Sequence, residues 1–171
     1  MKLQKLLSLT RQAIDEYGMI QENDKIAVGI SGGKDSLTLL YALSCLRKFY
    51  PHKFDIVAVT VDLGFDNLNL NGIRKFCKER EVEYHVIKTQ IAEVVFHREE
   101  SNPCSLCAKM RKGALNDAVK ELGCNKVAYA HHKDDLLESM MMSFLFEGRI
   151  HTFAPVTYLD RSGITVIRPL L

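Results

Sequence analysis

The 171-residue sequence predicts an α/β domain with a doubly wound, mostly parallel sheet of five strands. Two observations predict this fold class. Short runs rich in β-branched residues alternate with longer amphipathic stretches, which is the pattern of parallel strands joined by right-handed helical crossovers. Small and polar residues also follow directly after three of these runs, and sheets of this kind bind ligands at the carboxyl ends of their strands.

The elements can be assigned in chain order. Strands are expected at residues 25–30, 55–61, 83–88, 126–130 and 164–168, where β-branched and apolar residues gather. Helices are expected at residues 37–50, 69–80, 104–122 and 133–147. A short amphipathic helix comes first, with Leu3, Leu6, Leu7 and Ile14 on its inward face.

These elements divide the chain into an N-terminal helix, residues 1–24, and one α/β domain, residues 25–171. The sequence stops at Leu171, directly after a strand and a proline. Because no helix follows to cover that strand, we expect the domain to continue beyond this residue. An unusually short ending is the alternative.

Composition narrows the class of protein. Hydrophobic residues make up 47% and charged residues 26%, as in ordinary globular domains. The net charge is only +2, so any affinity for nucleic acid must come from a local basic patch. No apolar run could cross a bilayer, and Arg11, Asp15 and Glu16 interrupt any signal-like segment. Five cysteines, an odd number, argue against a secreted disulfide framework. We therefore expect a cytoplasmic protein without a membrane partner.

A six-residue loop follows the first predicted strand and precedes a helix. Two glycines let the backbone turn tightly, the helix directs its positive dipole end and free N–H groups at the same place, and two hydroxyls and a lysine add polar groups. The pattern predicts a phosphate-binding loop, and a tight turn before a capped helix is the alternative. The loop consists of Ser31, Gly32, Gly33, Lys34, Asp35 and Ser36.

This hexapeptide resembles the PP-loop signature of the ATP-pyrophosphatase superfamily, which includes GMP synthetase, NAD synthetase and several tRNA-modifying enzymes. The resemblance implies that ATP loses pyrophosphate while its AMP portion passes to an oxygen of the substrate. It also implies magnesium, which neutralises phosphate charge as the bond breaks.

Acidic residues follow two other strands. Asp62 closes the second strand, where it either lines a nucleotide pocket or caps the turn before Gly64. Asp134 and Asp135 open a helix after the fourth strand, either as helix caps or as magnesium ligands opposite the loop. The segment resembles the His-x-x-Asp-Asp motif of tRNA-thiolating and lysidine-forming enzymes, which implies site roles for both aspartates and for His132.

Two cysteines, Cys104 and Cys107, open another predicted helix. A lone CxxC fits redox chemistry, part of a metal site or chance packing. Cys45, Cys77 and Cys124 lie in apolar surroundings and are interpreted as packing residues.

The CxxC followed by Arg111, Lys112 and Gly113 resembles the tRNA 2-thiocytidine synthetases, as does the closing Ile-Arg-Pro-Leu. That resemblance implies that Cys104 and Cys107 help to hold a four-iron four-sulfur cluster, with a third cysteine shortly beyond Leu171. Lys109, Arg111 and Lys112 either form a solvated helix face or hold tRNA phosphates.

The resemblance implies an ATP-dependent tRNA thiolase. Asp35, Asp134 and Asp135 would act in catalysis, and the C2 oxygen of an anticodon-loop cytidine would be adenylated and replaced by sulfur from a cysteine desulfurase. A homodimer is possible. The alternatives are another adenylating enzyme of the uridine-thiolase or lysidine-synthetase type, and a noncatalytic ATP-binding fragment.

Overall fold

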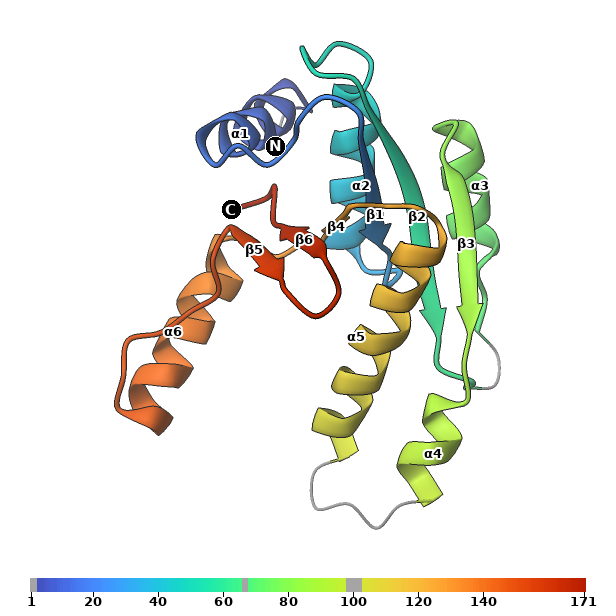
Figure 1. Ribbon diagram of the computed structural model, residues 1–171, viewed down its shortest axis with the longest axis vertical. Helices are drawn as coiled ribbons and strands as arrows, with labels where there is room; N and C mark the ends of the chain where they lie inside the picture. Colours follow the sequence, from blue (N-terminus) through green and yellow to red (C-terminus); the bar gives the residue numbers. More distant parts are fainter. Residues whose placement is uncertain (1–2, 66–67, 98–102) are drawn as a thin grey trace.

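The computed structural model describes residues 3–65, 68–97 and 103–171. A central sheet carries helices on both faces (Figure 1). The elements in chain order are α1 (Leu3–Glu16), β1 (Asp24–Gly29), α2 (Lys34–Leu46), β2 (Phe54–Asp62), α3 (Asn71–Glu79), β3 (Glu83–Lys88), α4 (Ile91–His97), α5 (Pro103–Glu121), β4 (Lys126–Ala128), α6 (Lys133–Glu147), β5 (Val156–Leu159) and β6 (Ile164–Ile167).

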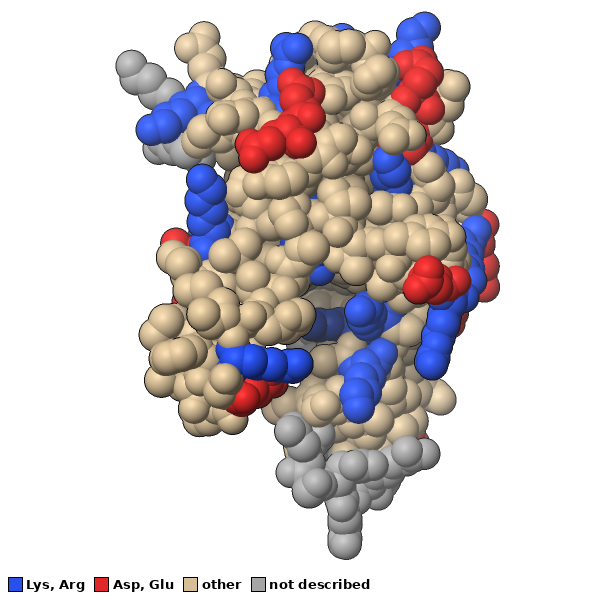
Figure 2. All heavy atoms as spheres, turned by 60° about the vertical axis from the view of Figure 1, so that its left-hand side comes forward, with Lys and Arg blue, Asp and Glu red and all other residues tan. Residues whose placement is uncertain are grey.

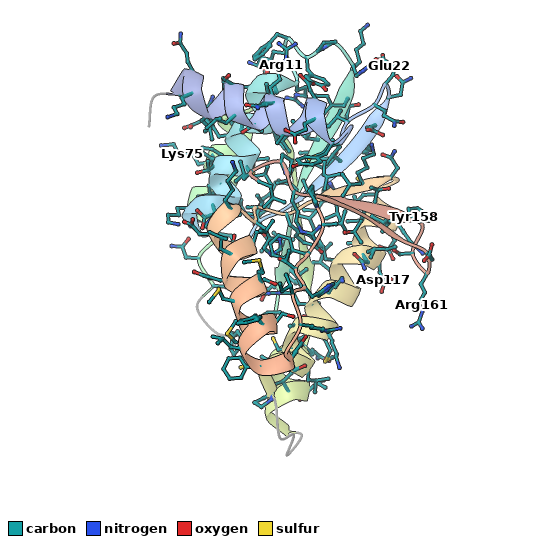
Figure 3. The ribbon with its side chains drawn as sticks, turned by 90° about the vertical axis from the view of Figure 1, so that its left-hand side faces the viewer. Arg11, Glu22, Lys75, Asp117, Tyr158 and Arg161 are labelled. Atoms are coloured by element: carbon teal, nitrogen blue, oxygen red, sulfur yellow. The ribbon has the colours of Figure 1, made fainter. Side chains whose placement is uncertain are left out.

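The sheet has the order β3-β2-β1-β4-β6-β5, and every neighbouring pair except β5 with β6 is parallel. The predicted doubly wound, mostly parallel architecture is confirmed, but the predicted number of five strands is wrong. The sixth strand, β5, is a short antiparallel edge strand that reaches β6 through a tight turn containing Gly163 at φ +68°. Tyr158 points outward from this edge and is 61% exposed (Figure 3).

Two apolar layers cover the two faces of the sheet. On one face, buried residues of α1 and α2 pack with β1, including Ile14, Leu40 and Val28. On the other face, α5 packs against the sheet through Leu115 and Val119. Ile14 is fully buried, so α1 shares the core of the α/β domain, whereas Leu3 is 46% exposed and the prediction that it faces inward is wrong.

A buried polar network joins β1 to β4 at the amino end of the sheet. The Lys126 ammonium lies 2.7 Å from the Asp24 carboxylate and donates to the Met19 carbonyl at 2.9 Å. Asn125 donates to the second carboxylate oxygen of Asp24 at 2.7 Å. Because both charged side chains are at most 10% exposed, the pair fixes the relation between the two strands that carry the site.

Candidate functional site

The six-residue loop, residues 31–36, connects β1 to α2. Its backbone conformation requires glycine at Gly32, where φ is +86°, while Gly33 has ordinary extended angles and caps α2. The buried Ser36 hydroxyl donates to the Gly33 carbonyl at 2.9 Å and accepts the Ser31 N–H at 3.3 Å. The Ser31 hydroxyl in turn accepts the Gly33 N–H at 3.4 Å.

This loop has the features of an anion site. Residues 31–34 are exposed, so a ligand can reach their backbone. The first N–H groups of α2 have no partner within the helix, and the helix dipole places partial positive charge at the same end. Phosphate groups bind readily at such a helix N-terminus.

Charged side chains sit at the mouth of the loop. The Lys34 ammonium contacts both Asp35 carboxylate oxygens, at 2.8 and 3.0 Å. This pairing raises the pKa of Lys34 and lowers the pKa of Asp35. Lys34 is 83% exposed, so the pair adds little stability and can open for a ligand.

The loop and the start of α6 lie within electrostatic reach of each other. Asp35 is the main cause of the raised pKa of Lys34, and the carboxylates of Asp135 and Asp134 make smaller contributions in the same direction. The positive charge of His132 likewise helps to lower the pKa of Asp35. β1 and β4 are adjacent parallel strands, so their carboxyl ends bring these two segments to one edge of the sheet.

The two aspartates of α6 have different surroundings. Asp135 accepts the backbone N–H of His132 at 2.8 Å, and its carboxylate lies 3.6 Å from Nδ1 of the same histidine. It therefore caps the helix that it opens. Asp134 is exposed and has no hydrogen bond or ion pair among the described residues. Asp134 is thus the carboxylate most available for a ligand or magnesium.

Asp62 has a structural partner. Its carboxylate accepts the N–H of Gly64 at 3.0 Å, and its carbonyl accepts the N–H and hydroxyl of Thr89. Gly64 has φ +87°, and a Cβ atom there would lie 2.8 Å from the Thr89 carbonyl. The carboxylate therefore shapes this turn at the carboxyl edge of the sheet. A role in nucleotide binding stays a prediction.

The two cysteines lie in the first turn and a half of α5, which projects beyond the sheet edge (Figure 1). Cys104 is exposed and Cys107 is half-buried, and their spacing of three residues puts them on one helix face. No group of three or more metal-binding side chains occurs among the described residues. Cys77 and Cys124 are buried, as packing residues should be, and Cys45 is half-buried.

A cluster that sequence reasoning missed lies at the carboxyl ends of β4 and β6. The His131 ring lies 4.9 Å from that of Phe153 and 5.8 Å from that of Tyr129. The Arg168 guanidinium lies 4.8 Å from the Phe153 ring and donates to the Ala154 carbonyl at 2.5 Å. Burial lowers the pKa of His131, and the nearby positive charge of Arg168 adds to this effect.

Basic residues extend the cluster towards α5. Burial raises the pKa of Tyr129, while the positive charges of Arg168 and Arg111 oppose that rise, so Arg111 lies within reach of the cluster. Lys109, Arg111 and Lys112 are all exposed on α5. Figure 2 shows a hollow on this side of the molecule with Lys and Arg side chains gathered around it. Two members of the cluster had a sequence signal: His131 begins the segment that resembles His-x-x-Asp-Asp, and Arg168 is part of the closing Ile-Arg-Pro-Leu.

The comparison with protein families shows which family the chain belongs to. The family model described as the PP-loop domain matches residues 3–171. The chain belongs to the PP-loop family. The predicted resemblance to this family is confirmed, and the assignment of residues 31–36 as the PP-loop stays a prediction.

Individual PP-loop proteins are similar over nearly the whole chain. The tRNA-cytidine(32) 2-sulfurtransferase of Geobacter sulfurreducens is 36% identical over 174 residues, which is 99% of this chain and 67% of the relative. The protein of that name from Geobacter metallireducens is 38% identical over 162 residues, or 94% and 63%. The chain therefore spans about two thirds of the length of these relatives.

A solved structure is also similar. The U34-tRNA thiolase NcsA from Methanococcus maripaludis, solved with its [4Fe-4S] cluster, matches with a TM-score of 0.77 and 28% identity. The match covers 98% of this chain and 58% of that one. None of the described helices is both long and apolar enough to span a membrane.

Proposed function

We propose that this chain is the ATP-binding part of a cytoplasmic tRNA thiolase that converts an anticodon-loop cytidine to 2-thiocytidine. The observation that carries the proposal is that the loop after β1 and the start of α6 follow adjacent parallel strands and lie within electrostatic reach of each other. This arrangement supports an anion site, suited to pyrophosphate, near carboxylates that suit magnesium. The similar 2-sulfurtransferases support the choice of tRNA cytidine.

In the proposed reaction, the C2 oxygen of the cytidine attacks the α-phosphorus of ATP and pyrophosphate leaves. The backbone amides of Gly32 and Gly33 would stabilise the departing charge, helped by Lys34 and Ser36. Magnesium would lie between the phosphates and a carboxylate of Asp35, Asp134 or Asp135. Asp62 and His132 would line the nucleotide pocket. The outer sulfur of a persulfide from a cysteine desulfurase, released as hydrosulfide by two electrons from a thiol reductant, then attacks C2, and AMP leaves with the former C2 oxygen.

The proposed tRNA site is the hollow beside α5. Lys109, Arg111 and Lys112 would hold phosphates of the anticodon stem-loop, because exposed cations release condensed counterions when they meet a nucleic-acid backbone. The charge of Arg111 reaches Tyr129, which links this basic surface to the carboxyl edge of the sheet where the nucleotide would lie.

A four-iron cluster is held by about four ligands, and no group of three or more metal-binding side chains occurs in the described part of the chain. Cys104 and Cys107 could provide two of these ligands from one helix face, but the donor set of the described residues is incomplete. The adenylation step is therefore assigned to the nucleotide-handling residues, and only the later transfer of sulfur would depend on Cys104 and Cys107.

The test of nucleotide chemistry is pyrophosphate release by the chain with ATP, magnesium and an anticodon stem-loop. Asp134→Asn should slow release at least about a hundredfold, because charge stabilisation at such sites is commonly worth that much. Asp117→Asn, which neutralises an exposed carboxylate on α5, is the matched control and should have no effect. Equal rates for the two variants would remove Asp134 from the mechanism.

The test of the substrate is mass spectrometry of tRNA nucleosides from a strain lacking the gene. Loss of 2-thiocytidine supports the proposal, and complementation by Cys104→Ala should fail although that variant still binds ATP. Loss of a thiouridine instead would favour the uridine-thiolase alternative. The structural similarity to the U34-tRNA thiolase is the observation that supports this alternative. Absence of any calorimetric heat with ATP and magnesium would refute both.

A further inference from the structure

Arg168 is a partly buried cation that lacks a counter-ion. It directly follows β6, at the carboxyl edge of the sheet. Its Nη1 donates to the Ala154 carbonyl at 2.5 Å and to the Thr157 hydroxyl at 3.3 Å, which fixes one end of the guanidinium to β5 and the residues before it. Its Nε is buried without a hydrogen-bond partner, and no carboxylate of the described residues pairs with the group.

A guanidinium in this position needs an anion. It keeps its proton although burial lowers its pKa, so its positive charge persists. Buried charges are ordinarily paired, and buried donors ordinarily have acceptors. Nε and Nη2 form the edge of the guanidinium that binds two oxygens of a phosphate or carboxylate, and neither atom has a partner among the described residues. This edge of Arg168 is therefore prepared for an anionic ligand.

His131 offers a second polar group in the same cluster. The Phe153 ring lies 4.8 Å from the Arg168 guanidinium and 4.9 Å from the His131 ring. Nδ1 of His131 is also buried and has no hydrogen-bond partner. Burial, followed by the charge of Arg168, lowers the pKa of His131, so the imidazole is neutral at pH 7 and can donate one hydrogen bond without adding positive charge.

The cluster lies two strands away from the loop of residues 31–36. That loop follows β1, the start of α6 follows β4, and Arg168 follows β6, and these three strands are adjacent and parallel. Neighbouring strands lie about 4.8 Å apart, so the ends of β1 and β6 are separated by roughly 10 Å. This separation exceeds the spacing of successive phosphates in one nucleotide. An anion at Arg168 is therefore distinct from the pyrophosphate that the loop would hold.

We propose that Arg168 and His131 bind one backbone phosphate of the substrate RNA, beside the nucleoside that is modified. The inference rests on the proposed function, because it takes the substrate to be RNA. The charge of Arg111 reaches Tyr129, whose ring lies 5.8 Å from that of His131, so the basic surface of α5 continues into the cluster. The hollow in Figure 2, with its surrounding Lys and Arg side chains, gives a nucleic-acid strand room on this side.

The two parts of this surface would act differently. The exposed cations of α5 attract phosphates without fixing their positions, because their side chains are free to move. Arg168 is held in place by its bonds to Ala154 and Thr157, so it accepts a phosphate in one position only. A contact of this kind sets the register of the RNA and thereby selects the nucleoside that reaches the nucleotide.

The first test is binding of an anticodon stem-loop RNA without ATP, measured by fluorescence anisotropy at several salt concentrations. Arg168→Met should weaken binding about tenfold or more and make the salt dependence shallower by about 0.7–0.9, the contribution of one phosphate. Arg168→Lys should keep the salt dependence and lose part of the affinity, because the two-pronged contact is gone. Arg161→Met should change neither, because this exposed arginine of the β5–β6 turn points away from the body of the protein (Figure 3).

The second test replaces single phosphates of the RNA loop with neutral methylphosphonates. Wild-type protein should lose about tenfold in affinity at one position, next to the modified nucleoside, and Arg168→Met should be insensitive to the replacement at that position. This scan of the RNA with wild-type protein stays decisive if a variant fails the check of its fold by circular dichroism. Equal effects at every position would overturn the proposal.

The remaining outcomes separate this inference from the proposed function. Unchanged RNA affinity and salt dependence in Arg168→Met would overturn the phosphate site and leave the proposed function standing. Loss of ATP binding in calorimetry of Arg168→Met, with RNA binding unchanged, would assign the cluster to the nucleotide and likewise overturn the inference. A wild-type chain that binds no stem-loop RNA would overturn both the inference and the tRNA substrate.

Discussion

Replacement of Lys126 by methionine isolates the buried ion pair that joins β1 to β4. Methionine is unbranched like lysine but one atom shorter, so the substitution removes the terminal ammonium with its charge and hydrogen bonds and keeps most of the apolar stem. Asp24 then loses a partner at 2.7 Å, and the Met19 carbonyl loses its donor. Because Asp24 is only 5% exposed, water cannot readily replace the lost ammonium.

The expected loss of folding free energy depends on the hydrogen bonds that Asp24 keeps in the Lys126→Met variant. Removing one partner of a buried ion pair typically costs about 3–5 kcal/mol. Asp24 keeps hydrogen bonds from Asn125 at 2.7 Å and from the Gln21 N–H at 2.6 Å, which places the cost near the lower end of that range. For a domain of this size each kcal/mol lowers the melting temperature by about 2–4 °C, so a fall of roughly 10 °C is expected.

The assay is urea and thermal unfolding followed by circular dichroism. The matched control is Arg11→Met, which breaks the exposed pair between Arg11 and Asp15 and should change stability by less than about 1 kcal/mol. The double variant Asp24→Asn with Lys126→Met should be more stable than Lys126→Met alone, because it removes the unpaired charge. Equal effects of Lys126→Met and Arg11→Met would refute the reasoning.

Three further substitutions test the carboxyl edge of the sheet. Gly32→Ala should lower the free energy of unfolding by about 1–2 kcal/mol, measured with urea, because φ at Gly32 is +86°. Gly33→Ala is the control and should lower it less, because φ at Gly33 is −75°. A larger loss of stability in Gly33→Ala would contradict this reasoning. The lowered pKa of His131 means that the unfolded chain binds its proton more readily, so this group costs stability as pH falls below about 6.5. His131→Phe keeps the ring contact and should reduce the loss of melting temperature between about pH 7.5 and 5.5; an unchanged loss would exclude His131 as its source.

Strands and helices with strong local patterns were predictable from sequence. β1, β2, β4 and β6 are short, mostly apolar runs, and buried strands of parallel sheets carry this signature because both faces are covered. β3 is a partly exposed edge strand, and Tyr84, Val86 and Ile87 marked it in the sequence. β5 was missed because it is a four-residue edge strand whose residues are all exposed or half-buried, so no burial pattern marks it. α4 was missed because its seven residues include two adjacent valines, which do not favour a helix.

The candidate site was predictable where its chemistry is local. The loop of residues 31–36 could be recognised because its glycines, hydroxyls and following helix are contiguous. The capping contact of Asp135 is equally local, and helix capping was one of the two interpretations left open. By contrast, the cluster of His131, Phe153 and Arg168 draws on three segments separated by 22 and 15 residues, and the pairing of β6 with both β4 and β5 brings them together.

The hydroxyls of Ser31 and Ser36 give the nucleotide loop its shape without help from a ligand. A loop that is already ordered loses little conformational entropy when it binds an anion. More of the attraction between the loop amides and the phosphates is then retained as affinity. Capture of the nucleotide should accordingly be limited by diffusion and by release of bound water, with no slow folding of the loop preceding it.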